Sequence, residues 1–295
     1  MINYLFRSLM FVPAHNERLL NSAVKSYADI LLLDIEDSVQ PSSNKEVARK
    51  NIKEYVMDGK FEGKVLFPRV NDRESGELLS DVLELTIEGV AGFMYPKSKT
   101  GKDVYFFSKL LETIEYQKNI PIGTFKIIPL IETAAAVLNI QEICTASDRV
   151  VAVSFGSEDF ISDLQGIHDH DDQSLFTARS LISMGARACN VIPIDTVHVR
   201  VHDLEDLEKN IIVAKNLGFE GMLVLNPKEL PIIHDYYTPN NREVEDAKEM
   251  LKLSEEAKKS GKGVAIMNGK FIGPPMVLKA KSILKKHSLI VAKKE

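Results

Sequence analysis

Apolar residues fall in eight short runs along the chain, and segments with apolar residues at helical spacing separate most of them. The runs cover residues 7–12, 29–35, 65–70, 92–95, 126–131, 150–155, 194–199 and 221–225. A continuous apolar run is typical of a parallel strand that is buried on both faces. Strands that alternate with helices predict a parallel α/β fold. Eight such units favour a closed (β/α)8 TIM barrel over an open doubly wound sheet.

The pattern changes after Pro231. Residues 241–259 predict a long charged helix, residues 261–273 are rich in turn formers, and residues 276–286 predict a final amphipathic helix. A segment of this length has too few residues to bury a core of its own. We therefore expect a barrel over residues 1–232 and a C-terminal helical extension over residues 233–295, which packs on the barrel or on a neighbouring subunit.

Composition excludes several classes of function. The 295 residues carry a net charge of −5 with a pI near 5.9, so no basic face indicates a nucleic-acid partner. Cys144 and Cys189 are the only cysteines and lack disulfide or metal-ligand spacing, which favours a reducing compartment. The chain shows no signal-peptide pattern, and no apolar run reaches the ~20 residues of a membrane helix. We expect a cytoplasmic protein that binds neither nucleic acid nor membranes.

Two acidic residues at neighbouring strand ends are the strongest candidates for chemistry. Glu132 follows the run 126–131, and Asp159 follows the run 150–155. Residues 133–144, between the runs, have apolar residues at helical spacing. A right-handed strand–helix–strand crossover places both strand ends at the same edge of the sheet. Two carboxylates that close repel each other unless a cation or a proton lies between them. Oxygen ligands favour Mg²⁺, or alternatively Mn²⁺, over zinc.

Other polar residues follow the remaining strands and converge on the carboxyl end of the barrel, which we call the mouth. Among them, Arg69 has a planar fork that can bind a substrate carboxylate through two hydrogen bonds. An ion pair of Arg69 with Glu36 or Asp37 is an equally compatible role. Residues 166–173 (GIHDHDDQ) contain many metal-ligating side chains, but their compact spacing in a predicted loop favours a loop over the mouth.

Several ordered segments are more specific than this physical pattern. They are RSLMFVPAHNERLL (residues 7–20), ADILLLDIEDSVQP (28–41), PLIETAAAVLNIQEI (129–143), FGSEDF (155–160) and LGFEGMLVLNPKELPII (217–233). In this order they resemble the citrate lyase beta-subunit-like family of the HpcH/HpaI aldolase/citrate lyase superfamily. That family also contains the malyl-CoA and citramalyl-CoA lyases. The resemblance covers almost the whole chain.

The resemblance implies a Mg²⁺-dependent barrel, commonly a homotrimer, that cleaves or forms a carbon–carbon bond beside a thioester on CoA or on a carrier protein. Glu132 and Asp159 match the metal-binding carboxylates of the family, and Arg69 matches the arginine that holds the oxo-acid. Glu36 and Asp37 match an acidic pair behind the metal site. We therefore predict a catalytic role for Arg69, Glu36 and Asp37.

Four residues are predicted to bind the substrate: Arg69, Arg7, Lys97 and Asn226. The segment Leu225-Asn226-Pro227 resembles the citrate lyase beta subunit more than the CoA lyases, which more often carry His-Pro. This favours cleavage of a citryl-type thioester to oxaloacetate and an acetyl thioester, with acyl carrier and transferase subunits as further partners. A malyl-CoA or citramalyl-CoA lyase is the alternative.

The chain departs from the family pattern at three positions. Ala14 and Ala136 stand where family members usually have glycine. Gly273 stands where the family usually has an aspartate that is implicated as an acid/base, often for the adjacent subunit. Because glycine cannot transfer a proton, a metal-binding homologue with lost or altered turnover is a third hypothesis.

Overall fold

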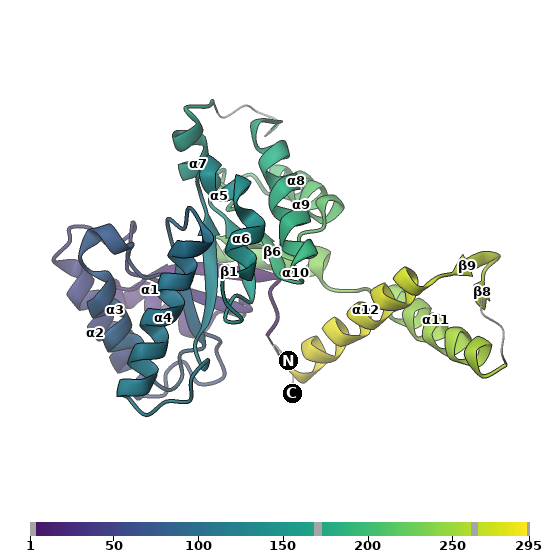
Figure 1. Cartoon of the computed structure of the whole chain (residues 1–295), viewed down its shortest axis with the longest axis horizontal. Coiled ribbons are helices and arrows are strands. Elements are labelled where there is room, and N and C mark those ends of the chain that lie inside the picture. Colours follow the sequence, from purple (N-terminus) through teal and green to yellow (C-terminus); the bar gives the residue numbers. More distant parts are fainter. Residues whose placement is uncertain (1–3, 168–172, 261–264, 294–295) are drawn as a thin grey trace. The chain divides into compact units, whose positions relative to one another are not determined.

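The computed structural model describes residues 4–167, 173–260 and 265–293, which divide into two compact units (Figure 1). The larger unit is Phe6–Ile233, and the smaller one combines the described residues of Met1–Leu5 with those of His234–Glu295. Residues 168–172, the centre of the His- and Asp-rich segment, lie outside the described residues, as do residues 261–264.

The larger unit is built on seven parallel strands in the order β2-β1-β7-β6-β5-β4-β3. Four of the seven strands are buried along their whole length, which is why they appear in the sequence as continuous apolar runs. The strands are β1 (Ser8–Pro13), β2 (Ile30–Asp34), β3 (Gly92–Tyr95), β4 (Lys126–Ile131), β5 (Ala152–Phe155), β6 (Ile192–Asp195) and β7 (Gly221–Val224).

Residues 65–70 join the two edges of this sheet. The Phe67 N–H donates to the Leu31 carbonyl of β2, and the Met94 N–H of β3 donates to the Pro68 carbonyl, both at 2.9 Å. Pro68 has no N–H, so this segment cannot form a regular ladder on both sides. The predicted TIM barrel is confirmed, with its eighth position filled by an irregular segment that bonds to both neighbours.

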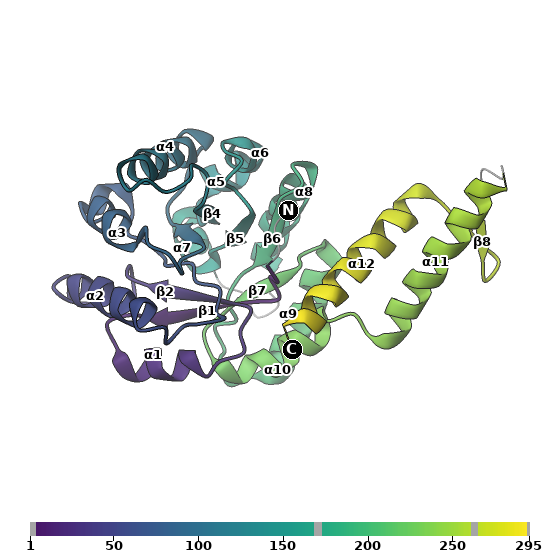
Figure 2. The same cartoon turned by 90° about the horizontal axis from the view of Figure 1, so that it is seen from below.

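Helices surround the strands, as Figure 2 shows. The prediction of one continuous helix over residues 133–144 is wrong, because the structure has two short helices that meet at Asn139. The side-chain amide of Asn139 donates to the Lys99 carbonyl at 3.1 Å. The helices are α1 (Glu17–Val24), α2 (Asn44–Met57), α3 (Leu78–Leu85), α4 (Gly101–Gln117), α5 (Ala134–Leu138), α6 (Ile140–Thr145), α7 (Ser157–Leu164), α8 (Gln173–Ala188), α9 (Leu204–Leu217) and α10 (Leu230–Tyr237), with short 3-10 turns η1 (Arg73–Ser75) and η2 (Pro227–Glu229).

Two strands begin with a glycine because a neighbouring backbone leaves no room for a side chain. A Cβ atom at Gly221 would lie 1.7 Å from the Phe6 carbonyl oxygen, and one at Gly92 would lie 2.2 Å from the Lys126 carbonyl oxygen. Any larger residue would push apart the strands that close the barrel.

The smaller unit pairs two long helices, α11 (Asn241–Lys259) and α12 (Pro274–Ala292), which lie side by side in both views (Figures 1 and 2). The predicted turn-rich segment between them contains a hairpin of β8 (Ala265–Met267) and β9 (Lys270–Ile272). Asn268 and Gly269 form its turn, both with positive φ, as a tight hairpin requires. Within the described ranges, every helix is too short or too polar to cross a membrane.

Candidate active site at the mouth of the barrel

Charged side chains from four neighbouring segments meet at the mouth, because each follows the carboxyl end of a strand or of the irregular segment. Asp34 is the last residue of β2, Arg69 lies in residues 65–70, Lys97 follows β3, and Glu132 follows β4 directly. Isolated parallel bridges pair Arg69 with Asp34 on one side and with Met94 on the other, so the backbone fixes this arrangement.

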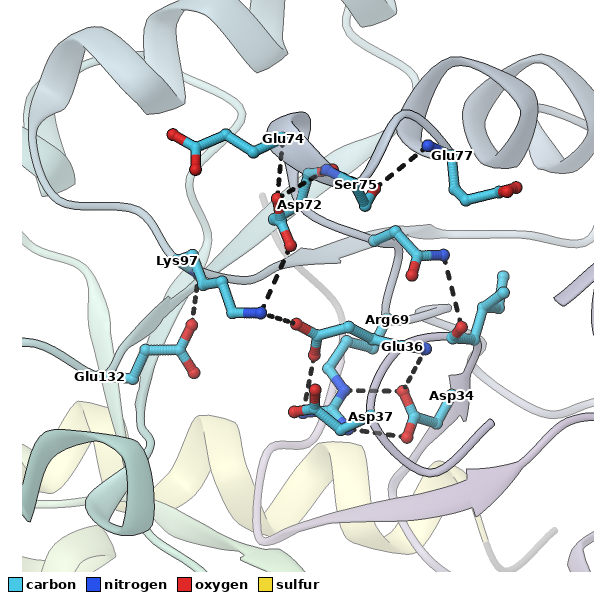
Figure 3. A network of polar contacts seen from close by, with 12 residues as sticks. Asp34, Glu36, Asp37, Arg69, Asp72, Glu74, Ser75, Glu77, Lys97 and Glu132 are labelled. Carbon is cyan, nitrogen blue, oxygen red and sulfur yellow. Dashed lines mark hydrogen bonds and ion pairs between the residues drawn. The ribbon is translucent and has the colours of Figure 1, made fainter. Parts of the chain in front are cut away.

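Arg69 is the centre of the network in Figure 3. Its Nε and Nη2 each donate to one oxygen of Asp34 at 2.7 Å, and its Nη1 lies 3.1 Å from Glu36 and 3.5 Å from Asp37. The guanidinium also lies over the ring of Phe11, 4.7 Å from its centroid. The ion-paired role that the sequence left open for Arg69 is therefore present, and the fork that was expected to hold a substrate carboxylate is engaged by Asp34.

Lys97 connects this network to the next strand. Its ammonium lies 3.0 Å from Glu36 and 3.3 Å from Asp72, between the two carboxylates in Figure 3. Its backbone has φ 54, a left-handed conformation that is uncommon for a residue with a side chain. The Lys97 N–H donates a short hydrogen bond to Oε1 of Glu132. This backbone contact helps to fix the orientation of the Glu132 carboxyl group.

Glu132 is a buried acid without a matching cation. Its residue is 2% exposed, and among the described residues its hydrogen-bond donor is a backbone N–H rather than a basic side chain. Burial and the negative charges of Glu36 and Asp159 raise the pKa of Glu132 to about 8, against the opposing effect of the Lys97 N–H and of Arg69. A carboxylate in this position is stabilised by a proton or by a cation.

Asp159 does not directly end a strand, in contrast to the interpretation from the sequence. β5 ends at Phe155, Gly156 caps α7, and Asp159 lies exposed in the first turn of that helix. The sequence alone could not separate the last strand residues from the first helical turn, because Ser157 and Glu158 suit either. Asp159 nevertheless lines the same two cavities as Glu132, and the role of the two acids as metal ligands stays a prediction.

The two cavities meet at these acids. The inner cavity has a volume of about 330 Å³. Its polar lining includes Arg69, Asp37, Glu132 and Asp159, and its apolar lining includes Phe11, Leu130, Phe155 and Leu223. The outer cavity has a volume of about 470 Å³ and is lined by Asp72, Arg73, Tyr95, Lys97, Glu132 and Asp159 among others. A small molecule in the inner cavity would therefore contact both acids and the arginine network at once.

Glu36 and Asp34 are both buried, but their pKa values shift in opposite directions. Burial raises the pKa of Glu36 to about 7, although Arg69 and Lys97 both favour its ionised form. Burial also opposes ionisation of Asp34, but the bidentate contact with Arg69 holds the pKa of Asp34 below its usual value. At neutral pH the mouth therefore contains one firmly ionised carboxylate beside an acid that can exchange a proton.

Arg7 lies away from this group, which corrects its prediction as a substrate-binding residue. It precedes β1 and its guanidinium donates to both oxygens of Asp29, which precedes β2, at 2.8 Å. Because the strands are parallel, both residues are at the amino end of the barrel, opposite the mouth. A buried ion pair at that end joins two strands, and it is too far along them to contact a ligand at the mouth.

Asn226 caps the 3-10 turn after β7. Its Oδ1 accepts from the Lys228 N–H at 3.1 Å, and its Nδ2 donates to the Val201 carbonyl at 3.2 Å. Both ends of the side chain therefore bond to backbone groups, and its substrate-binding role stays a prediction.

Two residues of the network were not predicted from the sequence. Asp34 lies inside the run DILLLDI and reads as part of a buried strand, and Asp72 reads as a turn residue, which it also is, since it caps η1. A charged residue inside a fully apolar run was the available signal for Asp34, because an acid in that position needs a buried partner.

Metal ligands are limited in number at this site. Across the described part of the chain, no three His, Cys, Asp or Glu side chains form a ready-made metal site. Mg²⁺ does not require one, since it is usually bound by one or two carboxylates and completes its shell with water and substrate oxygens. The buried carboxyl group of Glu132, which has no basic side-chain partner among the described residues, fits this kind of site together with the exposed Asp159.

Comparison with known proteins places the chain in a family. The profile of the HpcH/HpaI aldolase/citrate lyase family matches residues 7–227. The chain is 30% identical over 279 residues to the citrate lyase subunit beta of Leuconostoc mesenteroides, covering 95% of this chain and 92% of that protein. It is 28% identical over 306 residues to an L-malyl-CoA/beta-methylmalyl-CoA lyase of Rhodobacter capsulatus, covering 96% and 95% of the two chains.

Solved structures agree with this comparison. A citrate lyase from Burkholderia xenovorans has the same fold, with a TM-score of 0.83 over 97% of this chain and 92% of that chain, at 18% identity. A citrate lyase beta subunit from Mycobacterium tuberculosis, complexed with oxaloacetate and magnesium, has a TM-score of 0.65 over 80% of this chain and 99% of that chain, at 25% identity. With its barrel and most of its length matched, the chain belongs to the HpcH/HpaI aldolase/citrate lyase family.

Proposed function

We propose that this chain is a Mg²⁺-dependent carbon–carbon lyase that cleaves a citryl-type hydroxyacyl thioester to oxaloacetate and an acetyl thioester. The observation that carries the proposal is the position of Glu132 and Asp159, which line both cavities beside the Arg69 network. The relative with 30% identity is a citrate lyase subunit beta, and a solved relative was complexed with oxaloacetate and magnesium, which supports this substrate class.

Each residue of the site has a role in this proposal. Glu132 and Asp159 hold the metal ion, and the chemistry that Mg²⁺ supplies when bound is Lewis-acid polarisation of the oxo-acid oxygen. Arg69 offsets the negative charge of the substrate carboxylates. The atom that faces the substrate is Nη1, which lies 3.5 Å from the half-exposed Asp37. Lys97 adds a second positive charge at the rim and orients Glu132 through its N–H.

The proposed cleavage involves two proton transfers, which require a base and an acid at the site. Cleavage requires a base that takes the proton of the substrate hydroxyl as the carbon–carbon bond breaks, and an acid that protonates the acetyl thioester enolate. Glu36 and Asp37 are the carboxylates at the mouth that can serve as the base, and Glu36 has its pKa raised to about 7. Position 273 cannot supply the acid, because glycine has no side chain that carries a proton.

Two alternatives follow from specific observations. The likeness to the malyl-CoA lyase of Rhodobacter capsulatus supports a malyl-CoA or citramalyl-CoA lyase, in which CoA replaces a carrier protein as the thioester arm. Gly273 supports a homologue that binds the metal and oxo-acid with lost or altered turnover.

Assembly into a homotrimer is part of the proposal, and an acyl carrier and a transferase subunit are its proposed partners. On the hairpin of the smaller unit, Ile266 and Phe271 are paired across the two strands and are 66% and 58% exposed. An exposed apolar pair of this kind supports contact with another chain. Light scattering that gave a monomer at all accessible concentrations would contradict the trimer.

Calorimetric titration of Mg²⁺ and oxaloacetate tests the site itself. We expect Glu132→Gln to bind Mg²⁺ on the order of 100-fold more weakly, because it removes the buried carboxylate. Glu74→Gln is the matched control, since Glu74 also lines the outer cavity but is exposed. Equal binding by the wild type and Glu132→Gln would contradict the ligand assignment.

Turnover assays decide among the lyases. Citryl, malyl and citramalyl thioesters are offered with Mg²⁺, and release of the oxo-acid is followed. A protein that binds Mg²⁺ and oxaloacetate but cleaves none of them would support the homologue without turnover and end the lyase proposal.

The variant Gly273→Asp separates the lyases from that homologue. Gly273 has φ −93 at the N-cap of α12, a backbone conformation that aspartate adopts readily, so the variant should fold. The contact to be relieved is with the exposed ring of Phe271, 3.1 Å from the added Cβ. Increased cleavage is expected if the chain is a lyase that lacks its acid, and unchanged cleavage if it is not a lyase.

A further inference from the structure

A second polar cluster lies on the β6–β7 side of the mouth, among residues that have no role in the proposed site. His198 follows β6 and Glu229 belongs to η2, and the two residues are 4% and 0% exposed. Oε1 of Glu229 lies 4.0 Å from Nδ1 of His198. Neither of these two buried atoms has a hydrogen-bond partner among the described residues.

The other nitrogen of His198 defines what Nδ1 can do. Nε2 lies 3.0 Å from Oδ2 of Asp206, and the other oxygen of Asp206 lies 3.1 Å from the guanidinium of Arg200. A carboxylate that faces a guanidinium is an acceptor, so Nε2 carries the hydrogen and donates it. In a neutral imidazole whose Nε2 carries the hydrogen, Nδ1 is a hydrogen-bond acceptor, like the oxygen of Glu229 that it faces.

Glu229 likewise has one oxygen engaged. Oε2 accepts from the Asn226 N–H at 3.4 Å, which closes the cap of η2 and leaves Oε1 toward His198. If Glu229 is ionised and His198 is neutral, two acceptors face each other in a buried space, which is costly. One proton on either Oε1 or Nδ1 turns the pair into a donor and an acceptor.

Among the described residues, His198 is the one basic side chain within 4.0 Å of Glu229. The charged groups that line the small cavity beside His198 are Glu158 from α7, Arg179 from α8, Asp195 from β6, and Arg200 and Asp206. Arg179 is engaged by Asp195, to which it donates two hydrogen bonds, at 2.5 and 3.1 Å. In agreement with this environment, burial raises the pKa of Glu229 to about 7.

We propose that His198 and Glu229 hold one proton between them and act as positioning residues for the two loops that border this side of the mouth. Val197 and Val199, on either side of His198, line the inner cavity, and so does Leu225 beside the η2 cap. The contacts from Asp206 through His198 and Glu229 to Asn226 therefore connect the loop after β6 to the loop after β7. A hydrogen bond from Asn226 to the Val201 carbonyl connects the same loops a second time.

Urea unfolding between pH 5 and pH 9 tests the shared proton without any assay of activity. At low pH the wild-type pair keeps its proton, and above its pKa the facing acceptors destabilise the native state. In Glu229→Gln, the amide N–H donates to Nδ1 and its oxygen accepts from Asn226 at every pH. We therefore expect the stability of Glu229→Gln relative to the wild type to rise with pH and to change sign from negative to positive.

Two further variants complete this measurement. Glu229→Ala should be less stable than Glu229→Gln across the whole range, because it leaves Nδ1 and the Asn226 N–H unpaired. Glu74→Gln, at an exposed position, should follow the wild-type curve. Parallel curves for Glu229→Gln and the wild type would overturn the shared proton, whichever reaction the site catalyses.

The positioning role rests on the proposed function and is measured by oxaloacetate binding with Mg²⁺ at pH 7. Glu229→Ala should weaken binding about tenfold, as loss of a supporting contact behind a site does, and Glu229→Gln should restore it. Unchanged affinity in Glu229→Ala would overturn the positioning role. If the wild type bound no oxaloacetate, the proposed function would fail and the positioning role with it, while the unfolding curves would still decide the shared proton.

Discussion

The two polar clusters at the mouth of the barrel neutralise buried acids by different means. Around Arg69, basic side chains contact the acids directly: Asp34 and Glu36 lie 2.7 and 3.1 Å from its guanidinium, and Lys97 adds a contact of 3.0 Å to Glu36. Around Glu229, the described residues provide His198 as the one basic side chain within 4.0 Å. The first cluster is held by cations and the second by a proton.

This difference explains the behaviour of the acids. A carboxylate with a bidentate guanidinium keeps its charge, so the pKa of Asp34 is lowered despite burial, whereas burial without a fixed cation raises the pKa of Glu229 to about 7. Among the described residues, Glu132 resembles Glu229 in having no lysine or arginine side-chain partner, but it faces two cavities, and the exposed Asp159 lines both of them. A buried acid of this kind that borders a cavity can exchange its proton for a metal ion that enters the cavity.

Removal of Arg69 should have the largest effect on stability. Arg69→Met leaves Asp34 and Glu36 buried without their main cation, which should lower the free energy of unfolding by about 3–5 kcal/mol. Lys50→Met is the control, because Lys50 forms an exposed pair with Glu54 at 3.7 Å and should cost less than about 0.5 kcal/mol. Urea unfolding at pH 7 measures both. A loss of similar size in the two variants would show that the Arg69 network is not the cation-held cluster described above.

Asp34→Asn should have an intermediate effect that depends on pH. It removes the charge that accepts both hydrogen bonds from Arg69, at a cost of about 2 kcal/mol at pH 7. Because the pKa of Asp34 is lowered in the folded state, its contribution is present above pH 4 and is lost as the pH falls through the lowered value. The difference from the wild type should therefore shrink on acidification, opposite in direction to the loss expected for Glu229 as the pH rises. Unfolding curves between pH 7 and pH 3 that stayed a constant distance apart would contradict it.

Lys97→Gln should have the smallest effect on stability. The Lys97 side chain is 45% exposed, so solvent weakens its pairs with Glu36 and Asp72, and the cost should be below about 1 kcal/mol. Its backbone N–H still donates to Glu132, so Mg²⁺ binding should persist. Differential scanning calorimetry measures the stability, and Mg²⁺ titration measures the binding. A loss of Mg²⁺ affinity as large as that of Glu132→Gln would mean that the ammonium, and not the N–H, organises the metal site.

Much of the fold could be predicted because it depends on local pattern. Continuous apolar runs indicated buried parallel strands, and Glu36, Lys97 and Glu132, which were expected at strand exits, follow the carboxyl ends of β2, β3 and β4. The prediction was weaker where one residue has two compatible roles. Asn139 fits a helix interior on pattern, but the helix breaks there, and its side-chain amide bonds to the distant Lys99 carbonyl. Residues 65–70 read as a strand, and only the neighbours on both sides show how Pro68 is accommodated.

Partner choice could not be predicted, because it depends on residues that are distant in the chain. Arg69 bonds to Asp34, 35 positions earlier, and His198 faces Glu229, 31 positions later. Arg7 and Arg69 are the same residue type beside similar acids, yet they lie at opposite ends of the barrel. Which end a side chain occupies follows from its place before or after a strand, and the exact strand ends were decided by tertiary hydrogen bonds.

The sequence by itself determined the barrel, through the spacing of its apolar residues, and the family, through its ordered motifs. It also indicated that Glu132 follows β4 and that Asp159 comes after β5. Only the tertiary structure decided how each buried charge is balanced. Charge compensation acts over a few ångströms between segments that the chain brings together on folding. For that reason a buried carboxyl group is paired with a guanidinium at Asp34, faces two cavities at Glu132, and faces an imidazole at Glu229.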